Sequence, residues 1–161
     1  MVLQKTPQAL SSILRRVGEQ YDALARRRHL TMTLELPAQE LPLIAGDALA
    51  LERVFANLVH NALKFTPATG QVVVSVRQRP DGTGGVVVEV RDTGPGIAPE
   101  ELPSLFVKYH RTAATRHQEG TGLGLFIVKT LVEAQGGQVE VESRPGQGTC
   151  FRILLPTVSL L

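Results

Sequence analysis

Tryptophan is missing from this sequence, and aromatic residues, cysteine and long apolar runs are scarce. Aromatic residues make up 4% of the chain, which disfavours a surface on which nucleic-acid bases stack. The single cysteine, Cys150, cannot form an intramolecular disulfide or a metal cluster alone, so a reducing, cytoplasmic compartment is expected. No apolar run approaches the roughly 20 residues of a membrane helix. Residues 1–10 also lack the continuous apolar stretch of a signal peptide.

The rest of the composition is that of an ordinary globular protein. Its 161 residues are 43% hydrophobic and 20% charged, with a formal net charge of +2. At roughly 100–200 residues per domain, this length predicts one domain spanning residues 1–161 that buries a core without disulfides. So small a net charge gives no argument for a nucleic-acid partner.

Hydrophobic periodicity predicts the secondary structure. Apolar residues at helical spacing indicate helices over about 8–28, from Asp47 to just before Pro67, and over about 123–134. Alternating apolar and polar residues indicate strands at about 30–36, 72–76, 86–90, from 139 and at 151–155. Short turns join two of the strand pairs, so the pattern favours an α+β two-layer sandwich over a doubly wound parallel sheet.

The second predicted helix carries a polar stripe. Asn57, Asn61 and Lys64 fall at positions i, i+4 and i+7, so they share one side of the helix. Two carboxamides and an ammonium suit a phosphate chain and a hard cation. An asparagine carbonyl can ligate Mg²⁺, which prefers oxygen and usually keeps waters and substrate phosphates. Taken alone, a solvated helix face explains the stripe at least as well.

Three motifs combine glycine with polar residues. Asp92 to Ile97 follows a strand, where glycines let backbone pass close to a flat ligand and a carboxylate can accept from an exocyclic amine. Gly120 to Leu125 runs into a helix start, where free N–H groups bind anions. Gly146 to Thr149 joins two strands. Each motif alone is explained by turn chemistry, but the connection of about 30 residues between the first two is long enough to predict function there.

In this order and at these spacings, the motifs resemble those of sensor histidine kinases. The run Asn57 to Pro67 resembles the N box, Asp92 to Ile97 the first glycine box and Leu105 to Arg111 the F box. Gly120 to Leu125 is similar to the second glycine box, and Gly146 to Thr149 to the last one. The resemblance covers about residues 6–156.

The resemblance implies a fold shared with gyrase, MutL-type ATPases and the heat-shock chaperone ATPase. That Bergerat-type fold is a two-layer α/β sandwich in which a mixed, mostly antiparallel sheet packs against three helices. ATP lies among the helices under a mobile lid, which would span about residues 97–121 here. No dimerisation or phosphoacceptor domain is expected within this chain.

The resemblance also assigns the phosphate end of a Mg-ATP site. Asn61 would ligate Mg²⁺, while Asn57 and Lys64 would contact the phosphates. Arg111 would reach the terminal phosphates and, with Asn57 and Lys64, complete the catalytic set. Backbone N–H groups of the second glycine box, at Gly122 and Gly124, would face the phosphates.

At the base end, Asp92 would accept from the adenine amine and Phe65 would pack on the ring. Gly94 and Gly96 would admit the purine, and Thr149 would lie near it. The remaining residues that the resemblance places in the nucleotide site are Ile97, Tyr109, Gly120, Thr121 and Leu123.

A histidine kinase transfers phosphate to a histidine, and none of the four histidines here fits the acceptor motif. The resemblance therefore implies the catalytic module of a two-component kinase, which transfers the γ-phosphoryl group of ATP to a histidine on a separate dimerisation domain. A response regulator would be reached through the parent kinase, whose membrane anchoring the sequence leaves open. The module alone is expected to be monomeric and to autophosphorylate poorly.

Three alternatives belong to the same superfamily. An anti-sigma-factor-type serine kinase needs no acceptor hairpin, but the long lid disfavours it. An ATP hydrolase of the gyrase or MutL kind would carry an acid at position 57, which is asparagine here. A degenerate ATPase serving as an interaction module is disfavoured because Asn61, Asp92 and the glycine motifs are intact.

Overall fold

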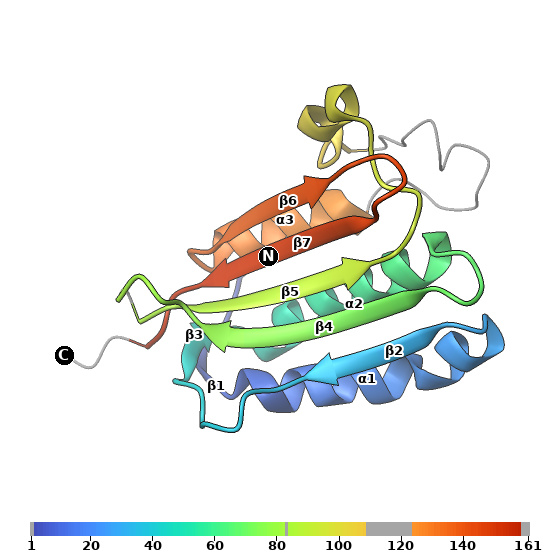
Figure 1. Ribbon diagram of the computed structural model, residues 1–161. Helices are drawn as coiled ribbons and strands as arrows, with labels where there is room; N and C mark the ends of the chain where they lie inside the picture. Colours follow the sequence, from blue (N-terminus) through green and yellow to red (C-terminus); the bar gives the residue numbers. More distant parts are fainter. Residues whose placement is uncertain (1, 83, 109–123, 159–161) are drawn as a thin grey trace.

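The chain folds into a five-stranded mixed sheet with helices on one face (Figure 1). The computed structural model describes residues 2–82, 84–108 and 124–158. The strands of the main sheet, in spatial order, are β2 (Thr31–Glu35), β4 (Gln71–Gln78), β5 (Val86–Asp92), β7 (Thr149–Leu155) and β6 (Gln138–Ser143). Only β2 and β4 run parallel, and the other neighbouring strands are antiparallel. The predicted α+β two-layer sandwich with a mixed, mostly antiparallel sheet is confirmed.

The α-helices of the described residues are α1 (Leu10–Arg27), α2 (Ala48–Phe65) and α3 (Gly124–Ala134). Each lies within about two residues of the span that its periodicity predicted. All three cover the same face of the sheet, behind the strands in Figure 1. None of the described helices is both long and apolar enough to cross a membrane.

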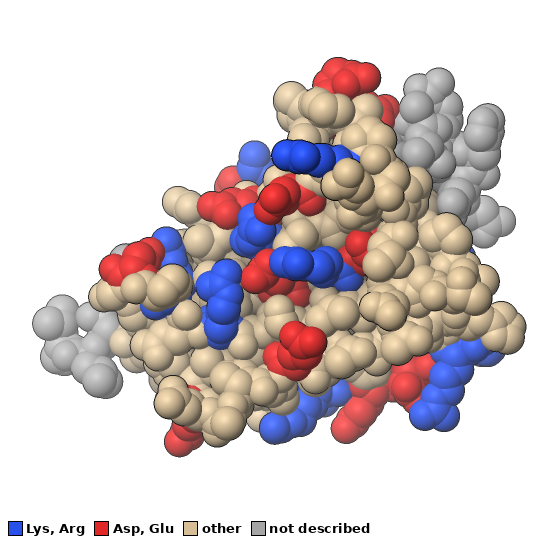
Figure 2. Space-filling model, in the orientation of Figure 1, with Lys and Arg blue, Asp and Glu red and all other residues tan. Residues whose placement is uncertain are grey.

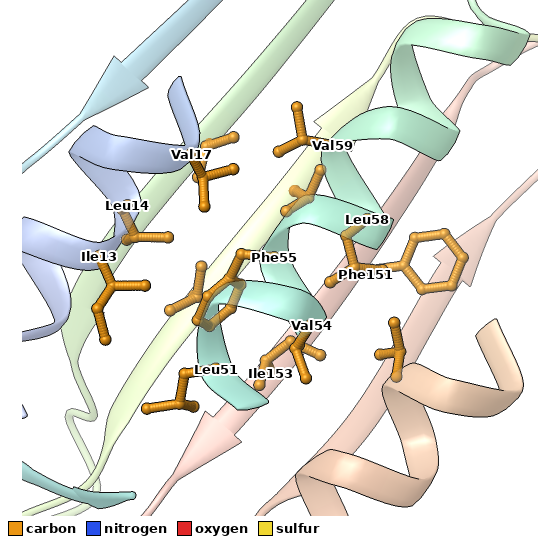
Figure 3. Close-up of a cluster of buried hydrophobic side chains, with 14 of the residues drawn as sticks. Ile13, Leu14, Val17, Leu51, Val54, Phe55, Leu58, Val59, Phe151 and Ile153 are labelled. Carbon is orange, nitrogen blue, oxygen red and sulfur yellow. The ribbon is translucent and has the colours of Figure 1, made fainter. Parts of the chain in front are cut away.

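The core lies between these helices and the sheet. Figure 3 shows side chains of α1, α2 and β7 converging there, with Phe55 of α2 fully buried between α1 and the sheet. The helix-facing residues of β5 and β7 alternate with open-face residues, so Val88 and Ile153 reach 0% exposure. This apolar layer fixes the sheet on which the candidate site is built.

Three short elements were not predicted from the sequence patterns. The strands β1 (Thr6–Gln8) and β3 (Ile44–Gly46) form a separate antiparallel pair. A 3-10 helix, η1 (Pro99–Ser104), lies inside the segment predicted to be the lid. Past η1, Leu105 is buried, and Ile97 packs against the core, so this part of the segment is anchored to the body of the molecule.

Both ends of α2 are held by side chains. Asp47 is the N-cap of α2: its carboxylate accepts from the Ala50 N–H at 3.0 Å and also from the Gln4 N–H at 2.9 Å. At the other end, the Arg28 guanidinium donates to the carbonyl of Lys64 at 2.8 Å. These bonds satisfy backbone groups that a helix leaves unpaired at its ends, and they fix the helix that bears the polar stripe.

The other face of the sheet is open and carries interspersed acidic and basic side chains (Figure 2). At its centre Glu89 is 8% exposed and forms ion pairs with Arg77 at 3.2 Å, Arg91 at 3.0 Å and Arg152 at 3.3 Å. Cys150 donates to the same carboxylate at 3.2 Å. Burial, followed by the neighbouring Glu89, raises the pKa of this thiol to about 11, which keeps it protonated.

Candidate nucleotide site

The polar stripe of α2 faces the start of α3. Asn57, Asn61 and Lys64 are all half-buried, so they border the apolar face of α2. Asn57 donates to the Arg53 carbonyl one turn back at 2.9 Å. Its side-chain oxygen lies 3.6 Å from the position that a β-carbon on Gly124 would take. The structure therefore brings the N box and the end of the second glycine box together.

A polar row crosses one end of the sheet. Ser143 on β6 pairs with Thr149 on β7, and Thr149 pairs with Asp92 on β5. These residues follow the same alternation as the buried Phe151 and Val90, so they lie on the helix-facing side of the sheet. Three polar side chains thus terminate a surface that is otherwise apolar.

Asp92 is half-buried at the end of β5, where its Oδ1 accepts from the Gly94 N–H at 2.8 Å. Burial raises the pKa of this carboxyl, although the backbone N–H groups of Gly94 and Thr149 counteract the shift. No cation among the described residues forms an ion pair with Asp92. A desolvated acceptor of this kind can bind a neutral donor such as an exocyclic amine.

The first glycine motif is hydrogen-bonded to the end of β6 and to the last glycine motif. The Pro95 carbonyl accepts from the Gly146 N–H at 2.7 Å, and the Ile97 N–H donates to Ser143 Oγ at 2.8 Å. Gly96 has a φ of +74°, and a β-carbon there would collide with the Arg144 carbonyl. These contacts with the turn between β6 and β7 require glycine at position 96. The role of Gly96 in admitting a purine, which the resemblance implies, stays a prediction.

Beside Asp92 lies a residue that the sequence reasoning did not single out. Thr66 is 1% exposed, and its Oγ1 has no hydrogen-bond partner among the described residues. This oxygen lies 3.6 Å from the position of a β-carbon on Gly94, while Asp92 Oδ1 lies 2.9 Å from that position. A buried hydroxyl without a partner is costly, so its place beside Asp92 fits a ligand or water at this point.

The described part of the F box packs next to this region. The ring of Phe106 meets the ring of Phe151 edge-on at 6.2 Å, and Lys129 Nζ lies 5.7 Å from the Phe106 centroid. Lys108 Nζ lies 5.8 Å from the ring of Phe126 on α3. Next to the stripe, Lys64 Nζ lies 5.4 Å from the ring of Phe65.

Several predicted site residues lie outside the described residues: Tyr109, Arg111, Gly120, Thr121, Gly122 and Leu123. Gly124 is the first residue of α3. The described residues contain no cluster of three or more His, Cys, Asp or Glu side chains that could hold a metal. The donor set at Asn61 fits a cation held chiefly by substrate phosphates and water, which is the usual mode for Mg²⁺.

A sheet covered on one face by helices, with Asp92 at a strand end and a polar stripe on α2, is the arrangement of a nucleotide-binding ATPase module. Residues 46–159 match the family model described as histidine kinase-, DNA gyrase B-, and HSP90-like ATPase. The chain belongs to this family, as its motifs predicted.

Among curated relatives, the chain is 35% identical over 150 residues to the adaptive-response sensory kinase SasA of Synechocystis, covering 93% of the chain and 38% of SasA. It is 32% identical over 148 residues to the sensor protein EvgS of Escherichia coli, covering 91% of the chain and 12% of EvgS. The chain thus spans well under half of the curated relatives it matches. These relatives are sensor kinases, which supports the histidine-kinase interpretation over the serine-kinase and hydrolase alternatives.

The solved structures that align with this chain also belong to histidine kinases. The mycobacterial sensor histidine kinase MprB aligns with a TM-score of 0.81 at 30% identity, covering 96% of this chain and 100% of that one. Full-length ShkA in complex with AMPPNP aligns with a TM-score of 0.84 at 32% identity, covering 99% of this chain and 33% of ShkA. The histidine kinase ThkA in complex with the response regulator TrrA aligns with a TM-score of 0.80 at 25% identity, covering 98% and 43%.

Proposed function

We propose that this chain is the catalytic and ATP-binding domain of a two-component sensor histidine kinase. It binds Mg-ATP and transfers the γ-phosphoryl group to a histidine of a separate dimerisation domain, from which a response regulator takes the phosphoryl group. The observation that carries the proposal is the desolvated carboxylate of Asp92, which lies beyond the end of the α2 polar stripe without a cation partner among the described residues. The AMPPNP complex of ShkA and the TrrA complex of ThkA support it by similarity.

At the base end, the carboxylate of Asp92 accepts a hydrogen bond from the adenine amine, and the absence of a side chain at Gly94 leaves space beside it. Thr66 lines the same end with its unpartnered hydroxyl. Phe65 packs on the ring, with Thr149 and Ile97 nearby. This arrangement selects a donor group on the base, because a carboxylate only accepts hydrogen bonds.

At the phosphate end, Asn57 and Lys64 hold the phosphate oxygens, and Asn61 supplies a carbonyl oxygen for Mg²⁺. The metal, when bound, neutralises charge on the phosphate oxygens. Arg111 from the lid, together with Gly122 and Gly124 from the second glycine box, completes the contacts. Of these residues, Asn57 and Gly124 lie next to each other where α2 meets the start of α3.

The reaction needs positioning more than covalent chemistry from this domain. A ring nitrogen of the acceptor histidine attacks the γ-phosphorus, the bond to the bridging oxygen breaks, and ADP leaves. Lys64 and Arg111 offset the charge that spreads over the transferred group. Because position 57 is asparagine rather than a carboxylate that could activate water, hydrolysis is slow compared with transfer.

The proposed boundaries follow the same similarity. The domain core covers about residues 6–156, and the lid covers about 97–121. The isolated domain is a monomer, with the dimerisation domain and the acceptor histidine in another part of the parent kinase. Nucleic acid is not among its partners.

The test is transfer from labelled ATP, with Mg²⁺, to the dimerisation domain encoded by the same gene. The wild-type chain should produce an acid-labile, base-stable product on the acceptor, as expected of a phosphohistidine, and little label on itself. Lys64→Met should reduce transfer at least tenfold, while Lys5→Met, which changes an exposed lysine remote from the stripe, should not. An acid-stable product, typical of phosphoserine, or rapid release of free phosphate would overturn the proposal.

A further inference from the structure

Ser143 is a residue that neither the motifs nor the proposed chemistry uses. It is the last residue of β6 and stands at the end of the polar row, across from Thr149. Its Oγ has three polar partners: the Ile97 N–H at 2.8 Å, the Gly148 carbonyl at 2.9 Å and Thr149 Oγ1 at 2.8 Å. One half-buried hydroxyl therefore links the end of the first glycine motif to the last glycine motif, whose Thr149 lies across from Asp92.

The hydrogen count at Ser143 fixes the direction of each bond. A serine hydroxyl has one proton and two acceptor lone pairs. The Gly148 carbonyl can only accept, so the proton of Ser143 goes to it. The Ile97 N–H can only donate. The contact with Thr149 must then use the proton of Thr149, which saturates Ser143.

Because its only hydroxyl proton is donated to Ser143, the Thr149 hydroxyl can only accept further hydrogen bonds. Its hydroxyl acts as an acceptor on the helix-facing side of the sheet, directly across the strand pair from Asp92, whose carboxylate is also an acceptor. Two neighbouring acceptors suit an exocyclic amino group, which has two hydrogens to donate. A purine with a carbonyl oxygen in that place would meet lone pairs instead.

We infer that Ser143 is a positioning residue of the nucleotide site. By taking the proton of Thr149 and holding the Ile97 amide, it makes Thr149 an acceptor beside Asp92, and this pair of acceptors selects a 6-amino purine over a 6-oxo purine. Ser143 acts through Thr149, directly or through a water between Thr149 and the base. The inference rests on the proposed nucleotide binding at this site.

The test is calorimetric titration of the whole chain with ATP and with GTP in magnesium buffer. Ser143→Ala should weaken ATP binding about tenfold, which is about 1.4 kcal/mol, and should lower the ratio of ATP to GTP affinity by a similar factor. Ser143→Thr keeps the hydroxyl and should retain both values within about twofold. Ser75→Ala is the matched control, because Ser75 stands on β4 on the opposite, open face of the sheet.

A double-mutant cycle separates positioning from a merely structural role. Thr149→Val removes the acceptor without touching Ser143 and should also lower the ATP-to-GTP ratio. If Ser143 acts through Thr149, adding Ser143→Ala to Thr149→Val should change ATP affinity by less than about twofold. Equal losses in both backgrounds would overturn the inference.

Two further outcomes separate this inference from the proposed function. A Ser143→Ala variant that unfolds at lower temperature but keeps the wild-type ATP-to-GTP ratio would overturn the inference and leave the proposed function standing. A wild-type chain that binds neither nucleotide would overturn the proposed function and the inference together.

Discussion

The side-chain oxygen of Asn57 lies 3.6 Å from the point where a β-carbon on Gly124 would stand. Asn57 is in the middle of α2, and Gly124 begins α3. Since 3.6 Å is an ordinary van der Waals contact, a methyl group would touch the carboxamide without clashing, whereas a larger side chain would displace it. This contact between α2 and α3 lies at the phosphate end of the proposed site.

Enlarging Gly124 should therefore weaken nucleotide binding in proportion to size. Gly124→Val is expected to lower ATP affinity about tenfold, or about 1.4 kcal/mol, and Gly124→Ala by less. Folding should survive both changes, because the first turn of a helix tolerates either residue. Calorimetry with ATP, with thermal unfolding of the nucleotide-free variants as the control, measures the two effects separately. A valine variant that binds ATP as well as the wild type would exclude Gly124 from the nucleotide site.

Asp92→Asn should raise the stability of the protein and lower its affinity for ATP. Burial raises the pKa of Asp92 in the folded state, so the folded protein binds this proton more tightly than the unfolded chain does. At pH values above both pKa values the ionised carboxyl consequently disfavours folding, and this penalty fades as the pH falls through the raised folded-state pKa. The neutral amide removes the penalty and should raise the melting temperature at pH 7.

The same variant should bind ATP at least tenfold more weakly, since the amide can present an N–H to the base where the carboxylate accepts. Glu40→Asn, at an exposed position in the loop before β3, is the control and should change neither property. A nucleotide affinity unchanged in Asp92→Asn would remove Asp92 from the base-binding role.

Thr66→Val replaces the unpartnered hydroxyl with a methyl group of the same shape. In the nucleotide-free protein this change should be neutral or should stabilise the fold by up to about 1 kcal/mol, because it removes a buried polar group that has no hydrogen-bond partner among the described residues. ATP affinity should fall about threefold to tenfold if the hydroxyl contacts the base or its water. Thr66→Ser keeps the hydroxyl and should bind normally. Thermal unfolding and calorimetry on the three proteins decide the matter, and equal affinity in all of them would refute the contact.

The main elements could be predicted because each has a strong local pattern. The apolar stripe of α2, with Asp47 at its start, and the valine alternation of β4 and β5 specify helix and strand directly. The pairing of β1 with β3 could not be predicted this way, since each strand has three residues and their partners lie far apart in sequence. The parallel pairing of β2 with β4 depends on how α1 and α2 pack, which periodicity does not encode.

The site residues also divide into those that the sequence reveals and those that only the structure reveals. Asn57, Asn61, Lys64 and Asp92 were found because motif spacing exposes them. Thr66 and Ser143 were missed because their importance comes from what surrounds them in space. Thr66 lies within the N-box run, but only burial reveals that its hydroxyl has no partner. Ser143 gains its role from three hydrogen bonds to two separate segments, at Ile97 and at Gly148–Thr149.

The charged cluster on the open face predicts an acid-sensitive contribution to stability. Burial alone would raise the pKa of Glu89, but hydrogen bonds from Cys150 and Arg91 and the charges of Arg152 and Arg77 outweigh it and lower the pKa. This stabilisation is present above the unfolded-state pKa and is lost as the pH falls through the lowered folded-state pKa.

Glu89→Gln should therefore destabilise the protein by about 1–3 kcal/mol at pH 7, and the difference from the wild type should shrink as the pH falls through the acidic range. Urea unfolding at several pH values measures it. Glu35→Gln, at an exposed position on the same face, should cost little at any pH. ATP affinity should not change in either variant, because the cluster and the site lie on opposite faces of the sheet. A Glu89→Gln deficit that stays constant down to the most acidic pH would argue against the ionic origin.

Asn61→Ala tests the metal role by comparing two buffers. If the Asn61 carbonyl ligates Mg²⁺ beside the phosphates, the variant should lose most of the increase in ATP affinity that magnesium confers. Binding in EDTA should remain within about twofold of the wild type, because the base and backbone contacts are untouched. Asn61→Asp places a carboxylate in the same position, which can still ligate the metal but repels the phosphates when the metal is absent. Its affinity should therefore fall more in EDTA than in magnesium. Identical magnesium dependence in the wild type and Asn61→Ala would assign the metal to another residue.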